Sequence, residues 1–271
     1  MPEEAEDIYN LIWQQKAIVN ILSKQDENGI WSDKDYGGMT ALRYLTALAE
    51  HGLRKDKRLD NYVDYINQKN VVSGGNDGDL SGCVTPLVLR ALVMMDYDVS
   101  DSIKKYATLQ LSDGGFICKR LLDKKPERKS CYKAAIGSLL LYAECKRKKV
   151  LPDNADELIN YFTKRDVFYS SDKTKKFDEG RSGWRVVDNF FPVEPMRMGI
   201  PLIMSALSIL GAGNHPALAE AWEMLKEKED ENGSFSLDGT LTKQPCRFGK
   251  VGQPNKWVTF YALLAEKERG F

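Results

Sequence analysis

Apolar residues recur every three or four positions along most of this chain, and no segment alternates apolar and polar residues as a half-buried strand does. Amphipathic stretches with this spacing cover residues 11–24, 102–109 and 217–228. Each is followed by a glycine, a polar loop and a second, more apolar stretch. The pattern therefore predicts an all-α fold built from helical hairpins.

A short motif marks the turn after each of these amphipathic stretches. Glycine takes the left-handed conformation at a helix end without steric cost, so we expect the glycine of the motif to end the helix. The aromatic residue two positions later is expected to fold back and cover the packed helix ends. The motif reads Gln-x-x-x-Gly-x-Trp at Gln25–Trp31, Gln-x-x-x-Gly-x-Phe at Gln110–Phe116 and Glu-x-x-x-Gly-x-Phe at Glu229–Phe235.

The second helix of each hairpin also has a recurring end, at Leu48-Ala49-Glu50, Tyr142-Ala143-Glu144 and Leu264-Ala265-Glu266. The gaps between the three glycine turns each have room for one degenerate hairpin. Residues 59–67 with 84–95 fit the first gap, and residues 157–164 with 200–210 fit the second. No linker rich in proline, glycine or serine divides the chain, so we expect five hairpins in a single domain, residues 1–271.

Charge and composition exclude several classes of protein. Lysine and arginine together number 39, as do aspartate and glutamate, which leaves no basic excess for binding nucleic acid. The longest mostly apolar stretch, 199–213, is too short to span a bilayer, so no transmembrane segment is expected. The acidic first residues do not resemble a secretory signal, and five cysteines form no staple pattern. These features favour a cytoplasmic protein.

The turn motif carries a resemblance to a known superfamily. Lys16-Ala17, Ile21, Gln25, Gly29 and Trp31 resemble the QW motif of squalene–hopene and oxidosqualene cyclases, with Asn20 where that motif prefers an aromatic residue. Gly114-Gly115-Phe116 is similar to the glycine-rich repeats of protein prenyltransferase β-subunits. Residues 252–264 resemble the last inner helix of small stand-alone cyclase-repeat proteins.

The resemblance implies an α/α toroid, in which parallel inner helices surround a central cavity and antiparallel outer helices enclose them. The loops that precede the inner helices would then gather at one end of the toroid. It also implies an isoprenoid-like or other apolar small molecule as the ligand. Neither the oligomeric state nor the identity of the ligand follows from the sequence.

The catalytic signatures of this superfamily are not found in the chain. Asp77-Gly78-Asp79 is followed by Leu80 and does not match the Asp-x-Asp-Asp motif of class II cyclases. No Asp-Asp-x-x-Asp run is present, and no Asp-x-Cys pair with a later histidine matches the zinc site of prenyltransferases. The chain therefore remains uncertain as an enzyme, and no cofactor is assigned.

Cysteines are the strongest remaining chemical signal. Cys83 and Cys131 each begin a predicted inner helix, while Cys118 and Cys246 lie in loops at the same end. These four thiols could hold a metal such as zinc, or provide a reactive thiol whose pKa is lowered at a helix N-terminus. The alternative is that they are small buried apolar residues, which is the more common role of free cysteine.

The other candidates are aromatic and charged residues near the predicted cavity mouth. Aromatic rings stabilise cations, and arginine or lysine would bind a diphosphate. The alternative is that the rings pack between helices and the charges are solvated. The ligand-binding candidates are Tyr132, Trp184, Arg185, Arg197, Lys256 and Trp257, and the catalytic candidates are Cys83, Cys131, Asp188 and Glu194.

Three functions remain open on this basis. The first is a cavity protein that binds an isoprenoid or another apolar ligand, with or without chemistry. The second is a non-catalytic binding or scaffold module. The third is a lyase or hydrolase that uses carboxylates and arginines at the cavity mouth, namely Arg185, Asp188, Glu194 and Arg197.

Overall fold

The computed structural model describes residues 3–32, 39–68, 84–117, 130–176, 186–189, 199–240 and 245–270. Within these ranges the regular structure is helical, and β pairing is limited to isolated bridges such as Glu229 with Phe235. The all-α prediction is therefore confirmed. The helices are α1 (Glu3–Gln14), α2 (Lys16–Leu22), α3 (Met39–Glu50), α4 (Lys57–Gln68), α5 (Thr85–Met94), α6 (Ser100–Ala107), α8 (Tyr132–Arg147), α9 (Ala155–Thr163), α10 (Ile200–Ile209), the 3₁₀ helix η2 (Pro216–Leu218), α11 (Ala219–Glu227) and α12 (Lys256–Arg269).

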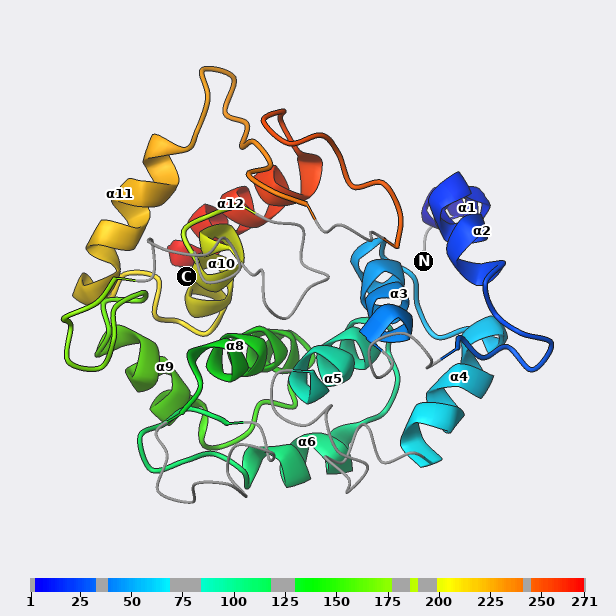
Figure 1. Ribbon diagram of the computed structural model, residues 1–271, viewed down its shortest axis with the longest axis horizontal. Helices are drawn as coiled ribbons and strands as arrows, with labels where there is room; N and C mark the ends of the chain where they lie inside the picture. Colours follow the sequence, from blue (N-terminus) through cyan, green and yellow to red (C-terminus); the bar gives the residue numbers. More distant parts are fainter. Residues whose placement is uncertain are drawn as a thin grey trace.

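Five helices, α3, α5, α8, α10 and α12, form an inner set (Figure 1). Each contacts the next one along the chain: α3 packs on α5, α5 on α8, α8 on α10, and α10 on α12. Their sequences explain this position, because α5 and α10 are apolar on nearly every face. All ten residues of α10 are buried, as are residues 132–145 of α8. A helix that is apolar all round is stable only inside the protein.

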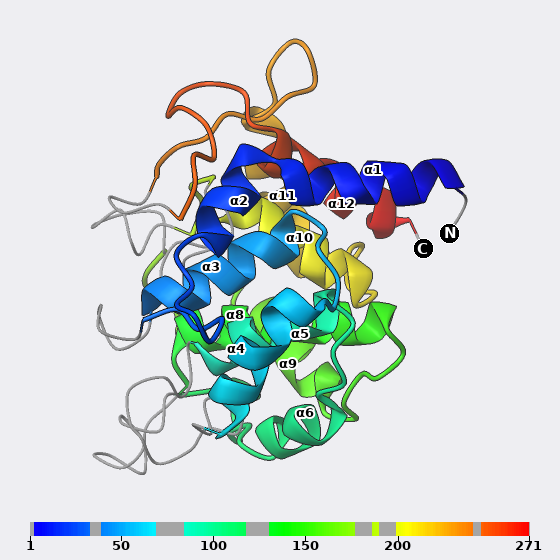
Figure 2. The ribbon, with the colours of Figure 1, turned by 90° about the vertical axis from the view of Figure 1, so that its right-hand side faces the viewer.

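The remaining helices lie outside the inner set and are amphipathic (Figures 1 and 2). In α4, for example, Leu59, Tyr62, Val63 and Ile66 are buried while the opposite face is polar. Helix α6 contacts α5, α9 contacts α8, and α11 contacts α10. An outer helix of this group therefore packs on the inner helix that precedes it in the chain.

The three glycine turns have the predicted conformation. Gly29, Gly114 and Gly233 have φ angles of 77°, 85° and 74°. The glutamine of the motif recurs because its side chain bonds across the turn. The Gln25 amide donates to the Gly29 carbonyl at 2.7 Å, and the Gln110 amide donates to the Gly114 carbonyl at 2.8 Å. The aromatic residues of the motif, Trp31, Phe116 and Phe235, are each 1% exposed.

The first predicted helix differs from the structure at both its start and its centre. We expect one helix over residues 11–24, but α1 begins at Glu3 and the helix is interrupted at Gln15, whose φ and ψ are −61° and 134°. Trp13 and Ile18 explain the interruption. Five residues of unbroken helix would turn them about 140° apart, yet both are buried in the core.

Two glycine-to-alanine changes test how strongly a turn is constrained. A methyl group at Gly114 would overlap the backbone carbonyl of Glu157, whereas nothing lies within 4 Å of one at Gly252, where φ is 76°. Gly252→Ala should therefore cost only the left-handed strain, about 1 kcal/mol, and Gly114→Ala should cost about 3 kcal/mol or more. Denaturant unfolding measures both, and equal losses would contradict this account of the turn.

Candidate functional site

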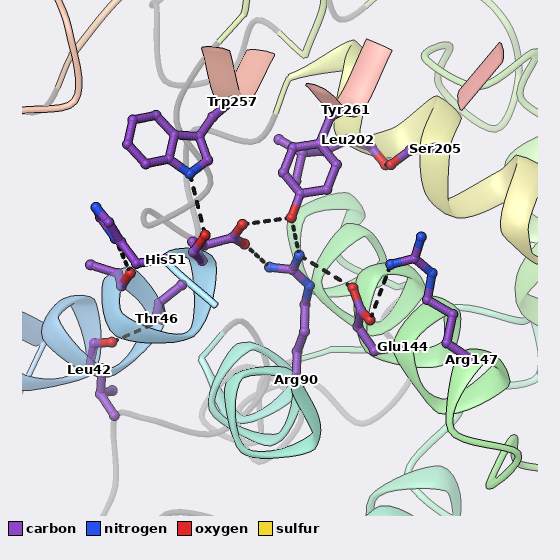
Figure 3. Close-up of polar contacts among 12 residues, drawn as sticks. Leu42, Thr46, His51, Arg90, Glu144, Arg147, Leu202, Ser205, Trp257 and Tyr261 are labelled. Atoms are coloured by element: carbon purple, nitrogen blue, oxygen red, sulfur yellow. Dashed lines mark hydrogen bonds and ion pairs between the residues drawn. The ribbon is translucent and has the colours of Figure 1, made fainter. Parts of the chain in front are cut away.

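The most prominent polar feature of the described interior is the Arg90 cluster, defined as Glu50, Arg90, Glu144 and Tyr261 (Figure 3). These residues come from four inner helices, α3, α5, α8 and α12. Glu50 is the last residue of α3, and Glu144 lies in the last turn of α8. The cluster thus joins helices that are far apart in the sequence.

Arg90 and Glu50 form its centre. An Arg90 Nη1–Glu50 Oε1 distance of 2.5 Å marks a charged hydrogen bond between side chains that are each 2% exposed. Arg90 Nη2 donates to the Tyr261 hydroxyl at 2.8 Å, and that hydroxyl donates to Glu50 Oε2 at 2.6 Å. Glu144 completes the charge balance, with Oε1 3.7 Å from Arg90 Nη2 and Oε2 3.8 Å from Arg147 Nη1.

Burial decides the protonation of this cluster. It raises the pKa of Tyr261 far above the usual value, so the hydroxyl keeps its proton and donates it to Glu50. It also raises the pKa of Glu50, and the attraction of Arg90 with the hydrogen bonds from Tyr261 and Arg90 offsets part of that change. Arginine stays charged in proteins. A buried charge is stable only when it is paired and hydrogen-bonded, as Arg90 is here.

The sequence carries only part of the signal for this cluster. Glu50 and Glu144 occupy the repeated Ala-Glu helix ends, which gave no functional assignment. Arg90 was missed, although it interrupts the apolar run of residues 84–95 and is 2% exposed. A lone charged residue within a fully buried helix is a signal that could have identified it.

Two predicted ligand-binding residues, Lys256 and Trp257, lie beside this cluster. Trp257 Nε1 approaches the Glu50 carbonyl oxygen at 3.4 Å, and its ring meets that of His51 edge-on with 5.1 Å between centroids. The Lys256 ammonium lies 4.2 Å from the centre of the Trp257 ring. The Asn255 side chain caps α12 by accepting hydrogen bonds from the backbone N–H groups of Trp257 and Val258.

Tyr132 and Cys131 lie at the other end of α8. Cys131 is the N-cap residue, as predicted, and is half-buried. The Tyr132 hydroxyl donates to the backbone carbonyl of Val167, and burial raises its pKa well above the usual value. Lys133, which sequence reasoning missed, is only 1% exposed. Twelve residues of helix, about 18 Å, separate Tyr132 from Glu144, so Tyr132 and Trp257 do not share one site.

A second polar cluster supports the start of α8. Asp113, in the Gly114 turn, accepts hydrogen bonds from the backbone N–H and the hydroxyl of Ser130. The Arg165 guanidinium lies 3.8 Å from Asp113 and stacks 3.6 Å from the centre of the Tyr161 ring. These contacts tie the glycine turn to the first residues of α8 and to α9.

The remaining candidates are either buried or fall outside the described residues. Asp188 is 8% exposed and lies next to Asn189, whose backbone N–H donates to Asp238. Cys246 is buried, and this raises the pKa of its thiol to about 11, the opposite of the change that activates a thiol. Cys83, Cys118, Trp184, Arg185, Glu194 and Arg197 lie outside the described residues.

The described part of the chain holds no group of three or more histidine, cysteine or acidic side chains arranged to bind a metal. A groove of about 580 Å³ opens on the outer face, between α6 and residues 150–154. Ile103, Val150 and Leu151 supply much of its apolar lining, and none of the predicted site residues lines it.

Comparison with known proteins gives no match to a family model, a curated relative or a solved structure. Among the described helices, none has both the length and the apolarity needed to cross a bilayer. The division of the chain into domains stays a prediction.

Removing the charge of Arg90 tests the cluster. Arg90→Met should lower the free energy of unfolding by about 3–5 kcal/mol, because it leaves the Glu50 carboxylate buried and unpaired. Arg147→Met is the matched control, since Arg147 is 38% exposed, and should cost less than about 1 kcal/mol. Adding Glu50→Gln to Arg90→Met should recover part of the loss. An Arg90→Met protein as stable as the control would refute this role.

His51 should make the free energy of unfolding depend on pH. Burial lowers its pKa from the usual 6.5, and the neutral ring lies 2.6 Å, through Nδ1, from the Ala47 carbonyl. The unfolded chain therefore binds a proton that the folded protein resists, so His51 makes stability fall as the pH drops below 6.5. Unfolding at pH 5–8 should show a smaller decline for His51→Gln than for the parent protein. The chain has two histidines, so His215→Gln serves as the control.

Proposed function

We propose that the chain forms a five-hairpin α/α toroid that binds an isoprenoid-like ligand at the end where α5 and α8 begin. The observation that carries the proposal is the group of packed rings at the start of α8, where the Tyr132 ring centroid lies 5.6 Å from that of Phe162 and 6.5 Å from that of Tyr161. These rings would bind the apolar chain of the ligand, and Lys133 in the first turn of α8 would bind its anionic head through a charge-assisted hydrogen bond.

The order of contacts among the inner helices supports the toroid. The inner helices pack on one another in chain order, and α12, the last, is hydrogen-bonded to α3, the first, through Tyr261 and Glu50. The Arg90 cluster lies among α3, α5, α8 and α12, near the ends of α3 and α8. The polar groups of the cluster bond mainly to one another, so we do not propose a ligand at this level of the interior.

The start of α5 and α8 is the better location for a ligand. Thr85 is the first residue of α5 and is 1% exposed, and Tyr132 begins α8 with its ring against Phe162 at 5.6 Å between centroids. Aromatic and aliphatic walls with a few polar groups are typical of small-molecule sites. In this proposal the cation is Lys133, and Tyr132 supplies the adjoining aromatic surface.

A second candidate is a scaffold that binds a partner on its outer face. The observation that favours it is the groove between α6 and residues 150–154, where Val150 is 41% exposed. Occupation of this groove involves no residue of the first proposal, so the two candidates can be tested separately.

Thermal unfolding with farnesyl diphosphate tests the first proposal. A ligand present at about 100 times its Kd stabilises the folded state by about 2.7 kcal/mol, which should raise the Tm by roughly 5–10 °C. Inorganic diphosphate should give little shift, because it lacks the apolar chain, and farnesol should give an intermediate one.

Two variants locate the binding. Lys133→Met keeps the volume and removes the cation, so it should abolish the advantage of farnesyl diphosphate over farnesol. Lys105→Met, on the exposed face of α6, should leave that advantage unchanged. No Tm shift with either isoprenoid, or an equal loss in both variants, would refute the proposal.

A further inference from the structure

Helix α12 leaves one apolar face uncovered. Phe260 and Leu263 are 52% and 47% exposed and lie three residues apart, so they form a stripe on one side of the helix. Among the other inner helices, α5, α8 and α10 are each covered by the outer helix that follows them, namely α6, α9 and α11. For α12, by contrast, no outer helix among the described residues covers Phe260 and Leu263.

Helix α1 has a stripe of the same kind. Ile8 and Leu11 are 63% and 58% exposed and also lie three residues apart. They are not the residues by which α1 packs on the protein, since Trp13 is buried in the core and the Tyr9 hydroxyl accepts a hydrogen bond from the backbone N–H of Arg54. Helix α1 therefore packs on the protein with one face and exposes apolar residues on another.

The two stripes match when the helices run antiparallel. Ile8 then lies opposite Leu263, and Leu11 opposite Phe260, because both pairs have the same spacing. In the same antiparallel arrangement, Asp7 near the start of α1 lies close to Lys267 near the end of α12. Both residues are exposed, so opposite charges flank the apolar contact. Packing an acidic first turn against a basic last turn also complements the two helix dipoles.

Figure 2 shows that α1 and α12 run in opposite directions on one side of the molecule, with the chain termini at the same end. In a single copy both stripes remain exposed, so α1 does not cover the stripe of its own α12. A two-fold axis parallel to these helices would place α1 of one copy against α12 of the other, twice. The result is two equivalent contacts between α1 and α12, in each of which the two helices run antiparallel.

We infer that the chain forms a symmetric homodimer through the α1/α12 stripe, defined as Ile8, Leu11, Phe260 and Leu263. In this dimer, α1 of the second copy covers Phe260 and Leu263 of α12. This inference rests on the two exposed stripes and their charges, and it does not depend on the ligand proposal. Stable interfaces bury roughly 1,200–2,000 Å² in total, so a stable dimer requires both helix pairs.

Sedimentation equilibrium of the full chain tests the dimer. The parent protein should be dimeric at micromolar concentration, and Phe260→Ser with Leu263→Ser should raise the dimer Kd at least tenfold. Both side chains are about half exposed, so circular dichroism should confirm an unchanged fold. Leu109→Ser, an equally exposed leucine elsewhere, is the matched control and should leave the Kd unchanged. A monomeric parent protein at 100 μM (roughly the top of the accessible range) would overturn the inference.

A charge exchange separates this pairing from other dimers. Asp7→Lys and Lys267→Glu should each weaken the dimer two- to fivefold, and the double variant should restore it. A mixture of isotopically labelled and unlabelled Ile8→Cys/Leu263→Cys protein should give mixed-label disulfides between positions 8 and 263. Cross-links confined to single chains, a dimer insensitive to the serine changes, or a double charge variant no stronger than the single ones would each refute it.

Discussion

The buried guanidinium of Arg90 requires partners that no single hairpin of this chain supplies. Arginine has five N–H donors and keeps its charge, so placing it inside an all-helical core is favourable only if carboxylates and hydroxyls converge on it. Here they come from α3, α8 and α12. Any arrangement of the inner helices that separated Glu50 from Arg90 would leave charges unpaired in a medium of low polarity, and one that separated Tyr261 from Arg90 would remove the acceptor of Arg90 Nη2. The cluster therefore selects one arrangement among the many that apolar packing alone would allow.

The inner helices differ in whether they contribute polar groups to the Arg90 cluster. Helix α10 has no charged residue, and in Figure 3 its Leu202 lies beside Tyr261, while the Ser205 hydroxyl donates to the Leu202 carbonyl at 2.8 Å. Thr46 of α3 likewise bonds the Leu42 carbonyl within its own helix. These two hydroxyls are thus bonded within their own helices, whereas Glu50 and Tyr261 bond Arg90, and the packing of the apolar surfaces provides the remaining stability.

The sequence predicts the local features well because their causes are local. The glycine turns follow from residues within seven positions, such as the Gln25 amide and the Gly29 carbonyl. The Arg90 cluster could not be predicted in the same way, since Arg90 lies 40 positions from Glu50 and 171 from Tyr261. The interruption at Gln15 also depends on tertiary packing, because Trp13 and Ile18 must both reach the core. For the candidate site, Tyr132 and Trp257 were placed correctly at helix starts, but the helices carry them to different levels of the molecule.

The hydrogen bond from Tyr261 to Glu50 has a consequence for how the molecule unfolds. In an open array of repeats each unit contacts only its neighbours, so the end units can detach without disturbing the middle. Here the Tyr261 hydroxyl of the last helix donates to Glu50, at the end of the first inner helix, and accepts a hydrogen bond from the central Arg90. Detaching either end exposes the same buried charge. Loss of α12 would therefore also destabilise α3, because Tyr261 and Glu50 bond each other and Arg90.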